Sequence, residues 1–409
     1  MKPELGEDSN FSLKLHLNQA KSCRILENFI VSARKYRPAT FDTVVGQSHI
    51  TTTLKNAIKS NHLAQAFLFC GPRGVGKTTC ARILAKTINC QNLRPDGEAC
   101  NQCDSCRSFN GGNSLNISEL DAASNNSVED IRSLIDQVRY PPQFGTRKVY
   151  IIDEVHMLST QAFNAFLKTL EEPPSYAIFI LATTEKHKIL PTILSRCQIF
   201  DFNRIQVKDI ASHLANIARK EEIGAEEEAL RLIALKADGA LRDALSMFDL
   251  MVTFSADRNL TYKLVIGNLH ILDYDYYFRI AEALMAEQTA QVMLIFDEII
   301  RQGFDGHNFI IGLNKHLRDL LMCKDKATVQ LLEVSNEVQQ RYLGQAMAAP
   351  VSFLLSALHL GHQCDVHFKM SKDQRLHVEI ALIKMANLPA AINLVQLDEG
   401  LKKKLMAAA

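Results

Sequence analysis

Short apolar runs alternate with helical patterns between about residues 40 and 200. A helix is predicted to start at Gly76, where apolar residues then recur three and four positions apart. Another is predicted over 161–170, before a Pro-Pro pair that cannot continue it. Three apolar runs predict buried strands, at 66–70, 149–152 and 177–181. Strands that alternate with helices predict an α/β fold with a parallel sheet.

Beyond about residue 205 the strand signal fades and the apolar positions follow helical spacing. One such stripe contains Leu241, Leu245 and Phe248, and a later one stops at Gly303, a residue suited to end a helix. The patterns predict five parts: an extension at 1–28, an α/β domain at 29–204, a small helical domain at 205–268, an all-α domain at 269–390 and a tail at 391–409.

Composition places the chain among ordinary globular proteins, because 47% of its 409 residues are apolar and 22% are charged. A formal net charge of +1 argues against a uniformly basic nucleic-acid binder. That average hides an asymmetry, since the segment 29–90 holds nine basic residues and one acidic residue, Asp42. We expect a cytoplasmic protein without membrane contact, because neither a secretory signal nor a run of about 20 apolar residues is found. Its cysteines are expected to be free thiols or metal ligands instead of disulfides.

The segment 71–78 fits the pattern G-x-x-x-x-G-K-[ST] of a phosphate-binding P-loop, between a predicted strand and a predicted helix. Lys77 can reach the β and γ phosphates of a nucleotide, and the hydroxyl of Thr78 can bind Mg²⁺. A chance glycine-rich turn is the alternative, but it would not need the flanking strand and helix. The expected nucleotide-binding residues are Gly71, Pro72, Arg73, Gly74, Val75, Gly76, Lys77, Thr78 and Thr79.

Two carboxylates, Asp153 and Glu154, close the predicted strand 149–152. Asp153 is placed to hold Mg²⁺ together with Thr78, and Glu154 to orient or polarise the attacking water. Acidic residues at the end of a strand are also common as plain solvated turns. Beside a P-loop, the pair predicts ATP hydrolysis in addition to binding. His156 follows them, and a single histidine there is more often structural than a metal ligand.

Four cysteines, Cys90, Cys100, Cys103 and Cys106, have the spacing C-x9-C-x2-C-x2-C. Four thiolates suit a tetrahedral Zn²⁺ and leave no open position for water, so the ion would be structural. The alternatives are chance clustering and an iron–sulfur cluster, whose ligand spacing is similar.

Polar residues beyond these motifs are weaker candidates on spacing alone. Thr183 and Thr184 follow the strand 177–181, where a side chain could contact the γ-phosphate. Arg196 and Arg242 could approach a nucleotide, but either could equally be an ordinary surface charge.

Taken together, the motifs resemble those of AAA+ ATPases of the clamp-loader clade, and within it the gamma/tau subunits of bacterial DNA polymerase III. The resemblance is dense from Phe29 to Phe202 and looser to about Pro389. Besides the P-loop, the acidic pair and the four cysteines, it is carried by ARKYRP at 33–38, VVGQ at 44–47, LEEPP at 170–174, LATT at 181–184, SRC at 195–197 and GALRDA at 239–244.

The resemblance implies several roles that spacing does not give. Thr184 would be the sensor-1 residue, Arg196 the finger that reaches the ATP of an adjacent subunit, and Arg242 the sensor-2 residue. The helical domains would be a lid over the nucleotide and a collar that joins the subunits. Residues near the adenine would be Arg37, Pro38, Val45 and Gly46.

The implied function is that of an ATP hydrolase within a DNA polymerase holoenzyme, which uses ATP, Mg²⁺ and Zn²⁺. It would load a sliding clamp onto primer–template DNA as part of a five-membered ring with other clamp-loader subunits. The N-terminus of a helix starting at Ser127 is a candidate DNA contact, although Ser127 and Asp130 could serve only as a capping box. Because the chain lacks the long tail that binds polymerase in the tau form, it resembles the shorter gamma form, and polymerase tethering is in doubt. Two rival functions remain, a DNA motor on the same core and a non-hydrolysing scaffold.

Overall fold

The computed structural model describes residues 30–142, 145–255, 257–269, 272–325, 327–332, 334 and 336–391. The expected extension 1–28 and all but the first residue of the expected tail 391–409 lie outside them. The chain divides into two compact units, Met1–Asn259 and Leu260–Ala409.

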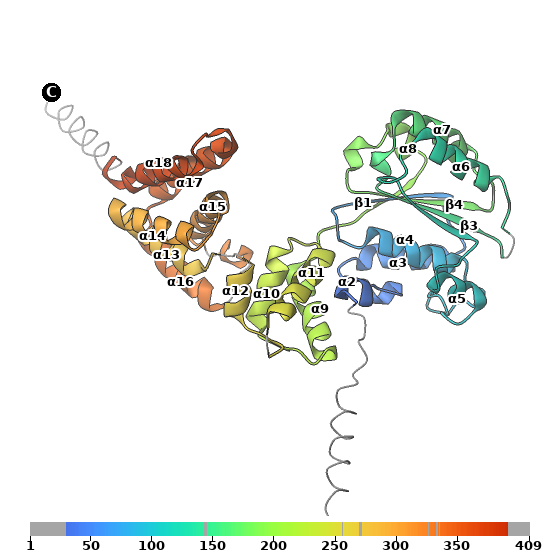
Figure 1. The fold of residues 1–409 in the computed structure, drawn as a ribbon, viewed down its shortest axis with the longest axis horizontal. Coiled ribbons are helices and arrows are strands. Elements are labelled where there is room, and N and C mark those ends of the chain that lie inside the picture. The colour runs from blue at the N-terminus through green and yellow to red at the C-terminus, as the bar shows by residue number, and fades with distance from the viewer. Residues whose placement is uncertain are drawn as a thin grey trace, which may run out of the picture. The chain divides into compact units, whose positions relative to one another are not determined.

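A five-stranded sheet forms the centre of the first unit, with strand order β2-β3-β4-β1-β5 and every neighbouring pair parallel (Figure 1). The three predicted strands occupy its middle, where both faces are covered. The two edge strands were not predicted. The strands are β1 (Ala66–Cys70), β2 (Ile117–Asp121), β3 (Lys148–Asp153), β4 (Ala177–Thr183) and β5 (Gln198–Asp201).

Helices cover both faces of this sheet. Helices α3 (Ser48–Lys59) and α4 (Lys77–Ile88) bury their apolar stripes against one face, in a core with Phe67 and Phe69. The opposite core contains Leu68 and Phe166, and its helices are α6 (Val128–Val138), α7 (Thr160–Glu171) and α8 (Pro191–Leu194). Because all strands are parallel, the ends of β1, β3 and β4 meet at one edge of the sheet, which is where ligands bind in such folds.

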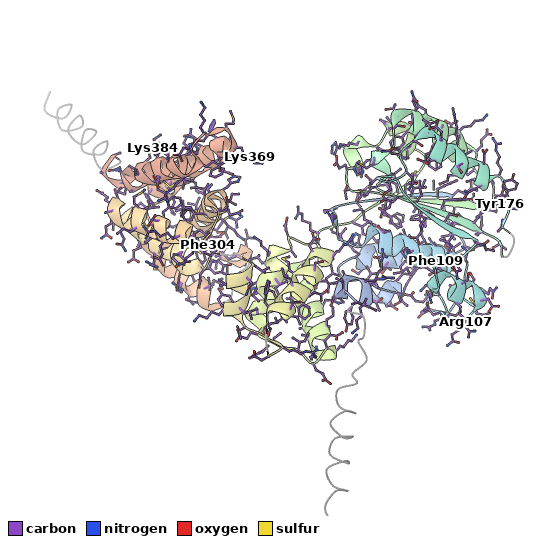
Figure 2. The ribbon with its side chains drawn as sticks, in the orientation of Figure 1. Arg107, Phe109, Tyr176, Phe304, Lys369 and Lys384 are labelled. Atoms are coloured by element: carbon purple, nitrogen blue, oxygen red, sulfur yellow. The ribbon has the colours of Figure 1, made fainter. Side chains whose placement is uncertain are left out.

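The cysteine segment forms a small module after α4, completed by the short helix α5 (Asp104–Asn110). Phe109, labelled in Figure 2, anchors α5 because it is buried in the core beneath the sheet. The guanidinium of Arg82 in α4 lies 5.1 Å from the centre of its ring.

The rest of the first unit is helical, with α9 (Val207–Lys220), α10 (Glu227–Lys236) and α11 (Leu241–Phe254) packed on one another. The predicted stripe of α11 is buried at Leu241, Leu245 and Phe248. Near the start of the described chain, α2 (Ser32–Lys35) packs on α11, and the backbone N–H of Ser32 donates to Oδ2 of Asp249 at 2.7 Å. Short elements complete the unit: η1 (Phe41–Thr43), η2 (Val155–Met157), η3 (Lys186–Lys188) and β6 (Gly224–Ala225). The two-residue strand β7 (Asn259–Leu260) spans the division between the units.

The second unit is helical around a single large core, and Phe304, labelled in Figure 2, packs against that core. Gly303 follows α14 with φ of 86°, as its predicted role in ending the helix requires. In the described part of the chain no single helix is long and apolar enough to cross a membrane, and one pair that meets this test jointly, Val338–Ala348 and Val351–Met370, is bent by 108°. The elements are α12 (Tyr262–Asn268), α13 (Tyr274–Met285), α14 (Thr289–Arg301), α15 (Gly306–Met322), η4 (Val329–Leu331), α16 (Asn336–Ala348), α17 (Val351–His367), η5 (Phe368–Met370) and α18 (Gln374–Ala386).

Candidate functional site

The P-loop connects the end of β1 to the start of α4, as its motif predicts. Its first glycine, Gly71, has φ of 149°, and a Cβ there would collide with the carbonyl oxygen of Phe202. Gly76, the residue before α4, has φ of 103°, which a residue with a side chain rarely adopts. The loop therefore needs glycine at these positions to turn tightly beneath a phosphate.

Lys77 is 5% exposed, and its Nζ donates to the carbonyl oxygens of Gly71 and Pro72, each at 2.7 Å. Burial lowers the pKa of this amine, while the charges of Glu154 and Asp153 oppose that shift. The ammonium group is thus held inside the loop by hydrogen bonds to neutral carbonyl oxygens. The oxygens of a phosphate can replace these weak acceptors.

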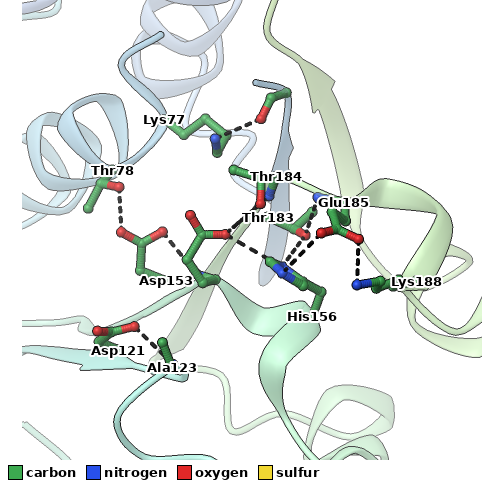
Figure 3. A network of polar contacts seen from close by, with 12 residues as sticks. Lys77, Thr78, Asp121, Ala123, Asp153, His156, Thr183, Thr184, Glu185 and Lys188 are labelled. Carbon is green, nitrogen blue, oxygen red and sulfur yellow. Dashed lines mark hydrogen bonds and ion pairs between the residues drawn. The ribbon is translucent and has the colours of Figure 1, made fainter. Parts of the chain in front are cut away.

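Thr78 and Asp153 meet across the end of the sheet (Figure 3). The hydroxyl Oγ1 of Thr78 donates to Oδ2 of Asp153 at 2.6 Å. The backbone N–H of Glu154 donates to Oδ1 of the same carboxylate at 3.0 Å. A hydroxyl and a carboxylate are ligands that Mg²⁺ accepts in nucleotide sites, so these two side chains fit the predicted magnesium position.

Glu154 adopts φ of 48°, in the left-handed region that few non-glycine residues occupy. Its Oε2 accepts hydrogen bonds from the hydroxyl and the backbone N–H of Thr184, at 2.9 and 3.3 Å. His156 lies beside it, with Nδ1 3.5 Å from Glu154 Oε2 and 3.1 Å from Thr183 Oγ1 (Figure 3). Thr184 therefore contacts the second carboxylate of the acidic pair directly, and His156 lies close to the same carboxylate.

A cleft of about 560 Å³ opens over these residues. Lys77, Thr78, Asp153 and Glu154 belong to its lining, and so do the arginines Arg34, Arg37, Arg73 and Arg242. Apolar side chains also line it, among them Val31, Pro38, Val44, Val45, Ile205, Leu241 and Leu245. A cleft that combines positive charges with apolar side chains suits a nucleotide, because its phosphates are charged and its base is not.

The structure brings most of the predicted site residues to this cleft. Arg37, Pro38, Val45 and Arg242 all line it, together with 73–79 of the P-loop. Arg37 donates from Nε to Thr79 Oγ1 at 3.3 Å. Its pKa is lowered by burial and by the positive charge of Arg82.

Three of the predicted nucleotide-binding residues do not line the cleft themselves, and neither do Thr184 and Arg196. Gly71 and Pro72 contact it through the Nζ of Lys77. Gly46 lies behind the wall, where a Cβ would come within 2.8 Å of Ile205 Cγ2. Sequence reasoning missed Val31, Ile205 and Ser246, because they come from distant segments that only the fold assembles.

Arg196 lies apart from the described residues that line the cleft. It follows α8, and its guanidinium forms an ion pair with Glu171 at 2.7 Å and donates to the carbonyl of Thr192 at 2.6 Å. A residue that acts on a neighbouring subunit would lie away from its own chain's nucleotide cleft, as Arg196 does.

The four cysteines converge, since their Sγ atoms all lie within 4.8 Å of one another. A tetrahedral Zn²⁺ with Zn–S bonds of about 2.3 Å would place its sulfurs about 3.8 Å apart. The observed spacing fits one ion between the sulfurs better than a larger cluster of several irons. Backbone N–H groups of Gln102 and Cys103 point at Sγ of Cys100 and lower the pKa of this thiol to about 6, which favours the thiolate that metals bind.

Family models match two stretches of the chain. The model "DNA polymerase III, delta subunit" matches residues 46–206, and "DNA polymerase III clamp loader subunit, ATPase lid domain" matches residues 209–257. The tau subunit of DNA polymerase III from Bacillus subtilis is 39% identical over 374 residues, which cover 90% of this chain and 66% of that protein. The Escherichia coli tau subunit is 38% identical over 87% of this chain and 55% of its own length.

The gamma subunit from Buchnera aphidicola is 36% identical over 88% of this chain and 98% of its own length. A solved structure of the Thermotoga maritima RuvB branch migration motor covers 61% of this chain and 79% of its own, at 20% identity and a TM-score of 0.44.

The fold, the P-loop and the lid-domain match define an AAA+ ATPase of the clamp-loader type. The chain belongs to the gamma/tau family of bacterial DNA polymerase III subunits. It spans less than two thirds of the tau relatives' own length.

Proposed function

We propose that this chain binds ATP with Mg²⁺ in the cleft and hydrolyses it. The observation that carries this proposal is the hydrogen bond of 2.6 Å between Thr78 and Asp153, with Lys77 and Glu154 beside it. The P-loop N–H groups and Lys77 would hold the phosphates, while Thr78 and Asp153 would hold Mg²⁺. The ion supplies positive charge against the leaving phosphate.

Glu154 would orient and polarise the attacking water, as the second carboxylate of the pair. Its present bond to Thr184 Oγ1, at 2.9 Å, supports a link between this carboxylate and the sensor-1 position. Arg242 would contact the phosphates from the lid side of the cleft. Arg196 would act on the nucleotide of an adjacent subunit, so that hydrolysis depends on assembly.

In cells the proposed role is to load a sliding clamp onto primed DNA, together with other clamp-loader subunits in a five-membered ring. The names of the relatives support this role, because they are subunits of DNA polymerase III. DNA would be contacted mainly at its phosphates. At the candidate contact, Ser127 and Asp130 do form a capping box at the start of α6, which by itself accounts for both side chains.

The test is the ATPase rate of the purified chain assembled with its partner subunits, with and without clamp and primed DNA. We expect the rate to rise when both are present, because the proposed loader hydrolyses ATP at the loaded junction. No stimulation would contradict the loader function. Strand displacement by the chain alone would instead favour a DNA motor, and an assembled ring without turnover at this subunit would favour a scaffold.

We also propose that the four cysteines hold one structural Zn²⁺. Elemental analysis should find about one zinc per chain, as expected for a closed four-thiolate site. Cys106→Ser should remove the ion and destabilise the first unit by several kcal/mol, as measured by thermal unfolding. The control is Cys323→Ser, a buried cysteine of the second unit, which should keep its zinc. Iron together with visible absorbance would identify an iron–sulfur cluster and contradict zinc.

A further inference from the structure

Two buried charged side chains, Glu98 and Lys86, link the cysteine module to a segment next to the nucleotide cleft. Glu98 is 2% exposed and Lys86 is 3% exposed. A buried charge is costly unless its partners compensate it, so the partners of these side chains show what holds them in place.

Glu98 lies within the module, two positions before Cys100. Its Oε2 accepts from the backbone N–H of Phe41, and its Oε1 from that of Asp42, both at 3.1 Å. The ammonium of Lys55 lies 2.9 Å from Oε1 and neutralises the charge. The carboxylate of Glu98 therefore fixes the start of the short helix η1 by hydrogen bonds, although the two lie far apart in the sequence.

Lys86 belongs to α4, the helix that starts at the P-loop. Its Nζ donates to the carbonyl oxygen of Ala39 at 2.8 Å and to Oδ1 of Asn101 at 2.7 Å. Asn101 directly follows Cys100 in the module. One ammonium group thus joins the helix, the cysteine module and the segment before η1.

The segment from Ala39 to Asp42 is consequently held by both charges. On either side of it, the apolar side chains of Pro38 and Val45 line the cleft, and Phe41 between them is buried in the core. We infer that Glu98 and Lys86 are positioning residues, through which the metal-bound cysteine module sets the base-binding end of the nucleotide cleft. This inference rests on the proposed ATP binding and on the proposed zinc site. The inference predicts that a metal ion bound by the four cysteines increases the affinity of the cleft for the nucleoside part of ATP.

The first experiment compares Glu98→Gln with Asp104→Asn, a matched change at an exposed acid of the same module. Neither carboxylate belongs to the four-cysteine cluster, so both variants should retain zinc. Because the amide NH₂ cannot accept from a backbone N–H, Glu98→Gln should bind ATP about tenfold more weakly, while Asp104→Asn binds as the wild type does. Affinity is measured by calorimetry on the full chain.

Inorganic tripolyphosphate provides the readout that a general loss of structure would not reproduce. It carries phosphates but no base, so its affinity should be unchanged in Glu98→Gln. Equal loss of ATP and tripolyphosphate would overturn the inference, because it would show damage to the whole site. Equal ATP affinity in Glu98→Gln and wild type would overturn it as well, whereas no ATP binding by the wild type would contradict the proposed function itself.

Zinc removal from the wild type is the second measurement, with release followed by a metal-sensitive dye. Removal should weaken ATP binding in the wild type but have little further effect in Glu98→Gln, since the same link is already broken. Additive losses would contradict the inference. If Glu98→Gln does not fold, Lys86→Met tests the same link from α4, with the same expected difference between ATP and tripolyphosphate.

Discussion

Lys77→Ala is expected to abolish ATP turnover, with a fall of about 10³-fold or more, because the variant loses a preorganised positive charge at the phosphates. In the structure the ammonium lies within the P-loop and donates to two neutral carbonyl oxygens, each at 2.7 Å. The ATPase rate of the assembled complex, together with ATP affinity of the chain, measures the effect.

The matched control for this change is Lys168→Ala, which removes an exposed lysine of α7 outside the cleft lining. It should leave both ATP affinity and turnover unchanged. Normal turnover in Lys77→Ala would show that hydrolysis takes place elsewhere in the complex, and the proposed role of this chain would be wrong.

Arg196→Ala should leave ATP affinity of its own chain intact and reduce hydrolysis in the assembled ring by about 10³- to 10⁵-fold at the site that it completes. The reason is its position, since Arg196 contacts Glu171 and Thr192 and lies outside the described cleft lining. An arginine outside the cleft lining is not placed to contact its own nucleotide, and in the proposed ring it would act on a neighbour's. Single-turnover hydrolysis in mixed rings, with the variant in a defined position, separates the two sites.

Two controls sharpen this second test. Arg139→Ala removes an exposed arginine paired with Asp136 and should not change turnover. Glu171→Gln breaks the intramolecular ion pair without removing Arg196, so hydrolysis should be retained. A loss of ATP binding in Arg196→Ala, or equal losses in Glu171→Gln and Arg196→Ala, would show that the ion pair is structural.

Strand prediction succeeded where the strands are buried on both faces. The middle strands β1, β3 and β4 read as unbroken apolar runs, because helices cover them on either side. The edge strands β2 and β5 have the sequences ISELD and QIFD, with several exposed positions. Their weak apolar signal is indistinguishable from that of a loop until a neighbouring strand is placed beside them.

From the sequence by itself, we could identify the residues whose chemistry depends on short motifs. The P-loop, the acidic pair and the four cysteines are local, because a tight phosphate loop and a closed thiolate site need particular residue types at fixed spacing. Resemblance to known motifs added Arg37, Pro38, Val45 and Arg242, and the structure places these residues along the cleft.

Only the tertiary structure decided which distant residues share the site and how they are held. Val31, Ile205 and Ser246 reach the cleft from three separate segments. The bonds of Glu98 to the N–H groups of Phe41 and Asp42 join positions 57 and 56 residues apart. Such contacts leave no periodic or motif signal, because a buried charge is stabilised by whatever partners the packed fold brings to it.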